Sequence, residues 1–371
     1  MHFPNNKNGF TLVELLVVIA LTATLATFFF FNLSGYNVSN SLQRVGESVA
    51  AALRSTRQKS LSQENGLRWG MHFSNSSTGQ TYTIFGGQNF ASSTFKNAYT
   101  LRSGILFGNP PASSSLDVIF DPITGVISQN QIISLIDGRS DGLVYNLFVN
   151  SLGDVLGRFE KGLVAYWPMD EGTGTITYDA SGDGNSGTLT NGPLWQSGSG
   201  CKIGSCLSFN PASSQYINVN NSNSLNVSNI TMTAWIYLTS YSCPADRGII
   251  VNKEGQYEWG IRCNAGNLDA AISPNWAWYG TTQVVPLNGW HFVVVTWDGS
   301  NQNYYIDGQL LQTYSLTNKG NITSGTGCLR IGARNGCGSA TSFFNGLIDD
   351  VRIYNRALSA SEIADLYNLT K

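Results

Sequence analysis

The chain has 371 residues, which is too long for one ordinary domain and fits two domains and an anchor. Only 12% of the residues are charged, against about 25% in typical soluble domains, and Gly, Ser, Asn and Thr replace them, as in turn-rich extracellular β proteins. The formal net charge is −2 without a basic tail or patch, so composition excludes a nucleic-acid footprint and no nucleic-acid partner is expected.

The N-terminus predicts a membrane helix behind a short polar leader. Lys7 and Gly9 precede an apolar run from Phe10 to Phe31 that carries a single charge, Glu14. A bilayer core needs roughly 20 apolar residues as a helix, and a charge inside such a span is a functional-site hypothesis. An ordinary secretory signal places its small-residue cleavage site after the apolar run, whereas Gly9 precedes it.

The string GFTLVELL, which begins at Gly9, resembles the leader of type IV pilins and type II secretion pseudopilins. The resemblance implies that a prepilin peptidase cuts after Gly9 and that Phe10 becomes the methylated N-terminus. It also implies that Glu14 neutralises the positive N-terminus of a neighbouring subunit in a filament, where a paired charge is far less costly than a lone one. A plain signal anchor is the competing interpretation.

Beyond Phe31 the sequence predicts an α+β head, an interpretation that rests on a change of periodicity. Apolar residues at three- and four-residue spacing continue a helix to about Ser62, and Arg54 and Arg57 are expected on its solvated face. From residue 67 to 159, β-branched and aromatic runs separated by Gly, Asn and Ser predict strands. The strings LRSTRQKSLSQENG and FVNSLGDVLGRF resemble minor pseudopilins, which implies a long helix packed on an antiparallel sheet.

A second module follows the short connection Glu160-Lys161-Gly162, so we expect the two modules to be closely coupled. Strand signals at roughly 8–12-residue spacing predict an all-β sandwich. The strings GLVAYWPMDEGTG, YDASGDGNSGTL, MTAWIYL, GWHFVVVTWDG and GLIDDVRIYNRALSASEIADLYN resemble the laminin-G/concanavalin A-like lectin–glucanase superfamily. The resemblance implies a jelly-roll-like sandwich that binds glycans or proteins, often with calcium.

These interpretations divide the chain into four segments. They are a leader peptide at residues 1–9, a transmembrane or filament-core helix at 10–31, a pilin- or pseudopilin-like helix plus β-sheet head at 32–160, and a concanavalin A-like β-sandwich at 162–371.

All six cysteines lie in the second module, which predicts disulfides in an oxidising compartment. Metal binding is the competing interpretation, but the sequence has only three histidines and no Cys-x-x-Cys pair. Sequence alone does not fix the connectivity. Proximity favours Cys201–Cys206, Cys243–Cys263 and Cys328–Cys337.

The string DASGDGN, from Asp179 to Asn185, alternates oxygen-bearing side chains with glycine. Calcium takes about six to eight oxygen ligands, and relatives often hold it with acidic residues from this stretch and from the strand around Asp350. Calcium is therefore the expected cofactor, and a loop of Asx-turns is the competing interpretation. The expected ligands are Asp170, Asp179, Asp183, Asn185 and Asp350.

The string NWAWY, from Asn275 to Tyr279, brings aromatic residues together in a polar segment. Trp276 and Trp278 would share a face if this segment is a strand. Sugars stack on exposed aromatic rings, so Trp276, Trp278 and Tyr279 are the expected glycan contacts. Burial in the sandwich core is the competing interpretation.

Catalysis is not expected of this chain. A retaining glycosidase needs two carboxyl groups about 5–5.5 Å apart, and the Glu-x-Asp-x-(x)-Glu strand of the superfamily's enzymes is absent from the sequence. Glu254 and Glu258 are four residues apart and no general-acid signature accompanies them. We therefore predict no catalytic residue.

The sequence thus predicts a minor or tip subunit, pilin-like or pseudopilin-like, that displays a lectin-like module for extracellular adhesion. The alternatives are a secretion pseudopilin that recruits exported substrates and a surface glycanase. Expected partners are other pilin or pseudopilin subunits, the prepilin peptidase, the inner membrane before assembly, and a glycan or surface-protein ligand. A single N-terminal helix would anchor the protein, with its globular part extracytoplasmic and at the cell surface or on a filament after assembly.

Overall fold

The structure is a computed structural model that describes residues 12–138, 143–316, 319–335 and 337–371. The side chains of residues 12–16, 18, 20, 23–39 and 199 are not part of that description. Gly9 and Phe10 lie outside the described residues, and of Glu14 only the backbone is described, as part of a helix. The predictions for these three residues therefore stay predictions.

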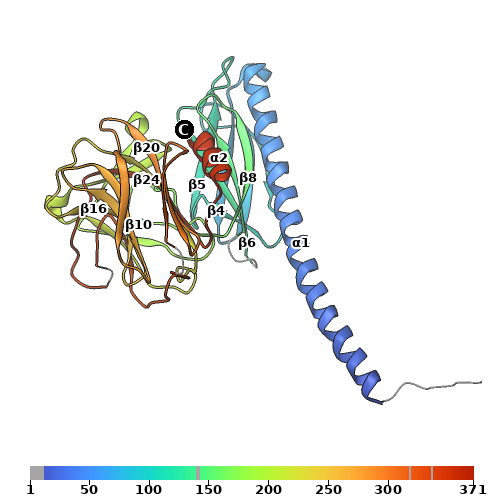
Figure 1. Cartoon of the computed structure of the whole chain (residues 1–371). Coiled ribbons are helices and arrows are strands. Elements are labelled where there is room, and N and C mark those ends of the chain that lie inside the picture. The colour runs from blue at the N-terminus through green and yellow to red at the C-terminus, as the bar shows by residue number, and fades with distance from the viewer. Residues whose placement is uncertain (1–11, 139–142, 317–318, 336) are drawn as a thin grey trace, which may run out of the picture.

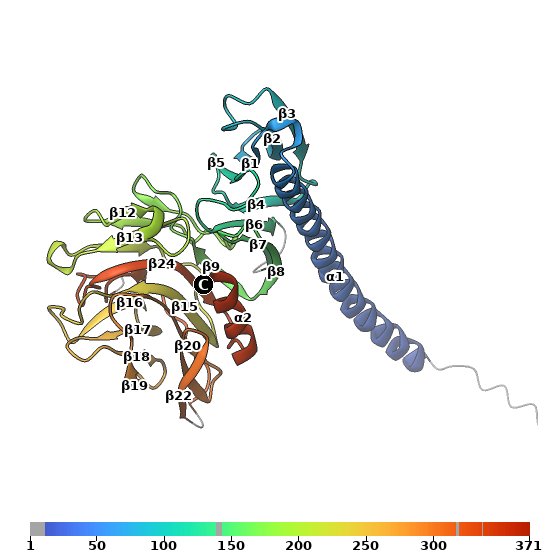
Figure 2. The ribbon, with the colours of Figure 1, turned by 90° about the horizontal axis from the view of Figure 1, so that it is seen from above.

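A single long helix leads into the globular part of the chain (Figure 1). Helix α1, Leu12–Leu61, has 50 residues and at about 1.5 Å per residue extends over about 75 Å. Its N-terminal half projects away from the rest of the chain, and its C-terminal half packs on the head through Leu42, Val49, Ala50 and Leu53 (Figures 1 and 2). Across the described residues, none of the helices is both long enough and apolar enough to cross a membrane.

The head contains two antiparallel four-stranded sheets, whereas the sequence predicted one. The first has the order β3-β2-β1-β5, with β1 Trp69–Ser76, β2 Gly79–Gly86, β3 Phe95–Thr100 and β5 Ser114–Phe120. The second has the order β4-β6-β7-β8, with β4 Ile105–Asn109, β6 Gln131–Asp137, β7 Leu143–Val149 and β8 Val155–Lys161. Strand β3 is exposed along its whole length and so lacks the alternation of apolar and polar residues that marks a half-buried strand.

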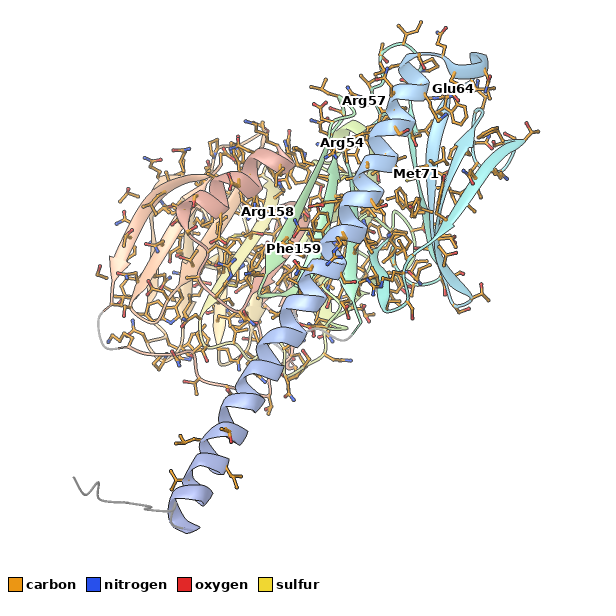
Figure 3. The ribbon with its side chains drawn as sticks, turned by 90° about the vertical axis from the view of Figure 1, so that its right-hand side faces the viewer. Arg54, Arg57, Glu64, Met71, Arg158 and Phe159 are labelled. Atoms are coloured by element: carbon orange, nitrogen blue, oxygen red, sulfur yellow. A yellow bond between two sulfur atoms is a disulfide. The ribbon has the colours of Figure 1, made fainter. Side chains whose placement is uncertain are left out.

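Arg54 is exposed and Arg57 partly exposed, as expected of a solvated helix face, and both also fasten α1 to the head (Figure 3). Arg54 donates to the carbonyl of Val155 at 2.8 Å. Arg57 donates to the carbonyl of Gly125 through Nε at 3.2 Å and to the carbonyl of Leu152 through a terminal nitrogen at 2.7 Å. Sequence periodicity missed this role because the acceptors are backbone carbonyls far along the chain.

The second module is a β-sandwich, as the sequence predicted. One sheet has the order β10-β11-β14-β23-β16-β17-β18-β19. Its strands are β10 Ile176–Thr177, β11 Gly187–Thr190, β14 Tyr216–Val219, β23 Leu329–Ile331, β16 Arg247–Lys253, β17 Tyr257–Arg262, β18 Asn267–Ile272 and β19 Trp278–Val284. We call this the distal sheet.

The other sheet has the order β12-β13-β24-β15-β20-β21-β22, and β9 pairs with β24. We call it the proximal sheet. Its strands are β9 Leu163–Trp167, β12 Leu194–Ser197, β13 Ser205–Phe209, β15 Ile230–Tyr237, β20 Trp290–Trp297, β21 Asn301–Ile306, β22 Gln309–Ser315 and β24 Gly346–Tyr354. The main hydrophobic core, including Trp259 and Trp297, fills the space between the two sheets.

A further hydrophobic cluster joins the two modules. Ile132, Val144 and Phe148 of the head pack with Tyr166 and Trp235 of the proximal sheet and with residues of α2, Ala360–Thr370. Helix α2 begins at the capping box formed by Ser359 and Glu362. The layers therefore follow the order α1, head, proximal sheet, distal sheet, which leaves the outer face of the distal sheet farthest from α1 (Figures 1 and 2).

Three disulfides hold loops of the sandwich, and they are the three pairs that sequence proximity favoured. Cys201–Cys206, Cys243–Cys263 and Cys328–Cys337 have Cα–Cα separations of 5.4, 5.6 and 5.0 Å. The described residues contain no free cysteine. Three short 3₁₀ turns complete the secondary structure, at Glu64–Gly66, Gly198–Gly200 and Pro211–Ser213.

Candidate functional site

The outer face of the distal sheet carries a row of polar and aromatic side chains. Alternate residues of β17 and β18, such as Trp259 and Ala270, enter the core, so their neighbours point outward. The strand register aligns Asn252 with Glu258, Glu258 with Ala271, and Ala271 with Trp278. We call this surface the Trp278 face. It consists of Asp246, Arg247, Glu258, Arg262, Asp269, Trp278 and Arg334.

The indole of Trp278 is the aromatic centre of this face. The guanidinium carbon of Arg247 lies 3.7 Å from the centre of its ring, and that of Arg334 lies at 5.2 Å. Trp278 itself is half-buried. A cation over an indole face is attracted by the ring's quadrupole, so Arg247 restricts the orientation of Trp278.

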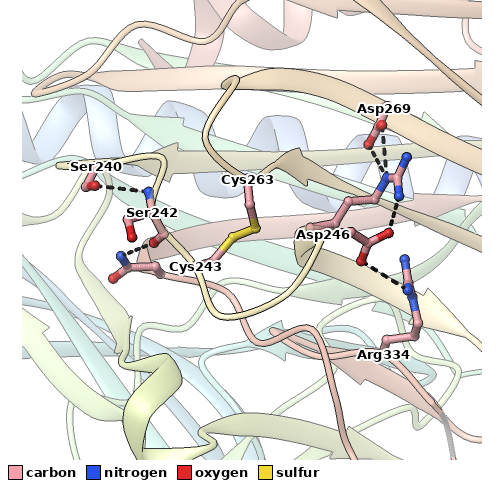
Figure 4. Close-up of a disulfide and its surroundings, with 9 residues drawn as sticks. Ser240, Ser242, Cys243, Asp246, Cys263, Asp269 and Arg334 are labelled. Atoms are coloured by element: carbon pink, nitrogen blue, oxygen red, sulfur yellow. Dashed lines mark hydrogen bonds and ion pairs between the residues drawn. A yellow bond between two sulfur atoms is a disulfide. The ribbon is translucent and has the colours of Figure 1, made fainter.

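Two carboxylates hold Arg247 in place. Its Nε donates to both carboxylate oxygens of Asp269, at 3.0 and 2.9 Å, and a terminal nitrogen donates to Asp246 (Figure 4). Gly280 pairs with Asp269 across the sheet, and a Cβ there would lie 2.7 Å from the Asp269 Cβ. Burial raises the pKa of Asp269, although Arg247 opposes the shift.

Glu258 serves as the counter-ion of Arg334. Its Oε2 accepts from Nε of Arg334 at 3.0 Å and from the amide of Asn252 at 3.1 Å. Burial raises the pKa of Glu258, and Arg334 partly offsets the shift. Glu254 has a separate partner, because its Oε2 accepts from the backbone N–H of Cys337 at 3.3 Å. The two glutamates therefore bind different residues of the loop that follows β23: Glu258 binds Arg334, and Glu254 binds Cys337.

The other predicted aromatic contacts lie in different environments. Trp276 is 41% exposed but sits in the turn before β19, with φ of +42°, so it does not share a strand face with Trp278 as the sequence suggested. The Tyr279 hydroxyl accepts from the amide of Asn275 at 3.0 Å, and its ring lies 4.9 Å from that of Tyr314. Trp276 is thus exposed and Trp278 partly exposed, whereas Tyr279 packs against Tyr314.

Two residues of the predicted calcium loop, Asp179 and Asn185, form hydrogen bonds with neighbouring parts of the sandwich. Asp179 accepts from the backbone N–H of Tyr166 and of Ser181, both at 2.9 Å, and from that of Asn185 at 2.8 Å. The amide nitrogen of Asn185 donates to the carbonyl of Val164 at 2.7 Å. These bonds are those of a loop stabilised by Asx-turns, which was the competing interpretation.

The remaining predicted calcium ligands do not complete a coordination shell. Asp183 is partly exposed in the same loop. Asp350 accepts from Arg352 at 2.7 Å, and Asp170 accepts from the N–H of Ser205 at 2.9 Å. Within the described part of the chain, no three His, Cys, Asp or Glu side chains are arranged to hold a metal ion. The calcium site at the five predicted residues stays a prediction.

Asp349, the neighbour of the predicted ligand Asp350 on the same strand, interacts electrostatically with Asp170. Asp349 accepts from the N–H groups of Lys202 and Ile203 at 3.1 and 2.9 Å. Asp349 Oδ1 and Asp170 Oδ2 are buried and have no hydrogen-bond partner among the described residues. Burial is the main reason that the pKa of each carboxyl is raised well above its ordinary value, and the charge of Asp170 adds to the shift at Asp349.

Sequence reasoning missed Arg247, Asp269 and Arg334, which organise the Trp278 face. The alternation of Glu258 and Arg262 with Tyr257, Trp259 and Ile261 could have marked the outward side of β17. No sequence signal places Arg334 there, because it comes from the loop after β23 and meets the face only in the folded sandwich.

Comparison with known proteins supports both sequence resemblances. Residues 211–364 match the family model of the concanavalin A-like lectin/glucanases superfamily, and residues 4–30 match the prokaryotic N-terminal methylation motif. The chain thus combines a type IV pilin-type leader with a concanavalin A-like module.

Several solved structures are similar to part of the chain. One is domain 4 of an extracellular GH43 arabinanase from Geobacillus stearothermophilus in complex with arabinotriose, at 19% identity and a TM-score of 0.43, with 56% of this chain and 98% of that domain covered. Another is the binding domain of Paraclostridial Mosquitocidal Protein 1, at 18% identity and a TM-score of 0.45, with 56% and 52% covered. A third is the botulinum neurotoxin serotype G binding domain, at 17% identity and a TM-score of 0.43, with 56% and 51% covered. The match spans about half of each toxin domain.

Proposed function

We propose that this protein is a minor or tip subunit of a pilin-type or pseudopilin-type assembly and that its sandwich binds extracellular glycans through the Trp278 face. The observation that supports glycan binding most directly is the half-exposed indole of Trp278, fixed by Arg247 on the outer face of the distal sheet. A sugar ring presents C–H groups that pack on such an indole. An aromatic side chain that is already ordered loses little conformational entropy on binding.

The order of the layers favours display away from the anchor. The head covers the outer face of the proximal sheet, so that sheet is closed to a large ligand. The outer face of the distal sheet lies on the opposite side of the sandwich from α1 (Figure 2). A subunit held by α1 would therefore present the Trp278 face outward.

The size of the second module favours a minor or tip position. Residues 162–371 add a complete sandwich beside the head, and a helical shaft packed from such subunits would be crowded. The leader supports the anchoring part of the proposal, because residues 4–30 match the methylation motif.

A glycan array tests the binding part of the proposal. A soluble form that starts at Asn40 retains every residue of the three hydrophobic clusters and is the natural probe. We expect the wild type to bind glycans and Trp278→Ala to lose at least one of them. A Trp278→Ala variant that binds the same glycans as the wild type would exclude the Trp278 face as a glycan site. A wild type that binds no glycan, with or without calcium, would contradict sugar adhesion and favour recruitment of exported proteins.

Replacement of Gly9 tests the anchoring part. We expect Gly9→Val to block cleavage, whereas the wild-type mature chain should begin at Phe10 with a methylated amine. Intact-mass measurement of the membrane-extracted protein distinguishes the two. Unchanged processing of the variant would contradict the pilin-type leader.

Calcium binding is a separate proposal for the sandwich. The buried, unpartnered oxygens Asp170 Oδ2 and Asp349 Oδ1 are the atoms of this chain that would contact the ion. The ion would neutralise two carboxylates that burial makes costly to ionise. The loop from Asp179 to Asn185 would keep its own hydrogen bonds.

A further inference from the structure

The sandwich has a polar cleft that shares no residue with the Trp278 face. Its volume is about 630 Å³, which lies within the range of about 300–1,000 Å³ typical of small-molecule sites. The loop between β14 and β15 forms one part of the lining. The rest comes from Val164 of β9, Asp183 of the loop between β10 and β11, and Asn355 just after β24. The polar lining residues are Asp183, Asn223, Ser224, Asn226, Ser228 and Asn355.

Part of this lining is fixed by the protein itself. The Ser224 hydroxyl accepts from the amide of Asn185 at 3.0 Å. Asn226 Oδ1 accepts from the amide of Gln256 and from the backbone N–H of Gly325, the latter at 3.3 Å. These bonds hold the wall of the cleft in one conformation before any ligand arrives, and such preorganisation lowers the entropic cost of binding.

Three other side chains still have hydrogen-bonding capacity. Asn223, Ser228 and Asn355 are exposed at the cleft, and within the described residues their side-chain amide or hydroxyl groups form no hydrogen bond. The charged groups of the Trp278 face, by contrast, are largely paired with one another. The cleft therefore offers a ligand more unpaired donors and acceptors than the aromatic face does.

The chemistry of the lining indicates a neutral ligand rich in hydroxyl groups. Each asparagine amide provides hydrogen-bond donors and an acceptor, and each serine hydroxyl can donate or accept a hydrogen bond. No Lys, Arg or His lines the cleft, and Asp183 contributes a carboxylate, which disfavours phosphate or carboxylate ligands. Val164 and Val227 add an apolar surface against which the C–H side of a sugar can pack.

We propose that this cleft is a second saccharide-binding subsite, specific for neutral sugar units and independent of the Trp278 face. This proposal rests on the proposed lectin function, because both sites would bind sugars for the same module. Its place in the fold is next to the head, because Val164 follows the junction closely and the N–H of Asn355 donates to the carbonyl of Gly162 at 2.8 Å. A sugar held here would therefore lie near the boundary of the two modules.

The test compares four forms of the full chain in detergent by isothermal titration calorimetry. They are the wild type, Trp278→Ala, Asn223→Trp and Asn220→Trp. Asn223→Trp fills the cleft, whereas Asn220 is an exposed residue of the same loop outside the lining and serves as the matched control. The probes are cellotriose, maltotriose and chitotriose, with trigalacturonate as the anionic comparison.

We expect Asn223→Trp to weaken the binding of at least one neutral trisaccharide by tenfold or more, with Asn220→Trp and Trp278→Ala retaining it. Trigalacturonate binding should not respond to Asn223→Trp. The cleft proposal is overturned if Asn223→Trp binds every probe as the wild type does, or if Trp278→Ala alone abolishes all binding. A wild type that binds no probe would instead overturn the lectin function and the subsite together.

Discussion

The carboxylate of Glu160 and the guanidinium of Arg352 meet across the boundary of the two modules, with Oε2 and Nε 3.7 Å apart. Both side chains are buried, with exposed fractions of 1% and 0%. The Tyr354 hydroxyl donates to the same Glu160 oxygen at 2.5 Å, and Arg352 also donates to Asp350 at 2.7 Å. Because Glu160 lies on β8 and Arg352 on β24, the head and the sandwich share one buried ionic cluster.

Removal of the Glu160 charge should destabilise the whole globular part. Glu160→Gln leaves buried Arg352 with Asp350 as its remaining anion, and we expect the free energy of unfolding to fall by about 2 kcal/mol. Urea denaturation followed by tryptophan fluorescence measures the change. Lys161→Gln, the adjacent exposed residue, is the control and should be neutral. A change below about 0.5 kcal/mol in Glu160→Gln would mean that the cluster does not couple the modules.

Arg247 should act as a positioning residue for Trp278. Arg247→Ala removes the cation 3.7 Å from the indole centre, so we expect about tenfold weaker binding of any glycan held by the Trp278 face. The tryptophan emission spectrum should change in the free protein as well, because the environment of the ring changes. Lys319→Ala, an exposed cation of the sandwich outside the Trp278 face, is the control. Equal glycan affinities in the two variants would exclude Arg247 as a positioning residue for Trp278.

The anchoring of α2 should weaken in acid. Hydrogen bonds from Arg356 are the main cause that lowers the pKa of Glu362 from 4.5 to about 2. A carboxyl with a depressed folded pKa stabilises the fold above its unfolded value and loses that contribution as pH falls from 4.5 to about 2. We expect Glu362→Gln to lower the Tm at pH 6 and to reduce the further fall between pH 4.5 and pH 2. Asp365→Asn on the same helix is the control, and an identical pH profile in Glu362→Gln would contradict the assignment.

Calcium should act through Asp349 and not through Asp179. We expect CaCl2 to raise the Tm of the wild type relative to EDTA, and Asp349→Asn to abolish the increment, because one of the two buried unpartnered oxygens then belongs to an uncharged group. Asp179→Asn should lower the Tm, since it weakens three backbone hydrogen bonds, yet keep the response to calcium. Differential scanning calorimetry with MgCl2 as the comparison measures all three forms. Equal Tm values of the wild type in CaCl2 and EDTA would refute the calcium proposal.

Local signals in the sequence determined much of this protein. The leader around Gly9 is a contiguous motif, and the three disulfides link cysteines only 5, 20 and 9 residues apart. The capping box of Ser359 and Glu362 spans one helical turn. The sandwich was predicted from short strand signals separated by turns. Each of these features depends on residues that are close in the chain. The leader and the capping box can therefore be recognised without the fold, and proximity favours the disulfide pairs without fixing them.

Tertiary structure alone decided the arrangement of the site and of the modules. Arg247 stacks on Trp278 from another strand, Arg334 reaches Glu258 from a loop, and Glu160 meets Arg352 across two modules. Asp179 accepts from the backbone N–H groups of Tyr166, Ser181 and Asn185, and the first of these belongs to strand β9. These contacts join residues that are far apart in the sequence at irregular distances. Packing of the folded chain, and not local conformation, brings them together.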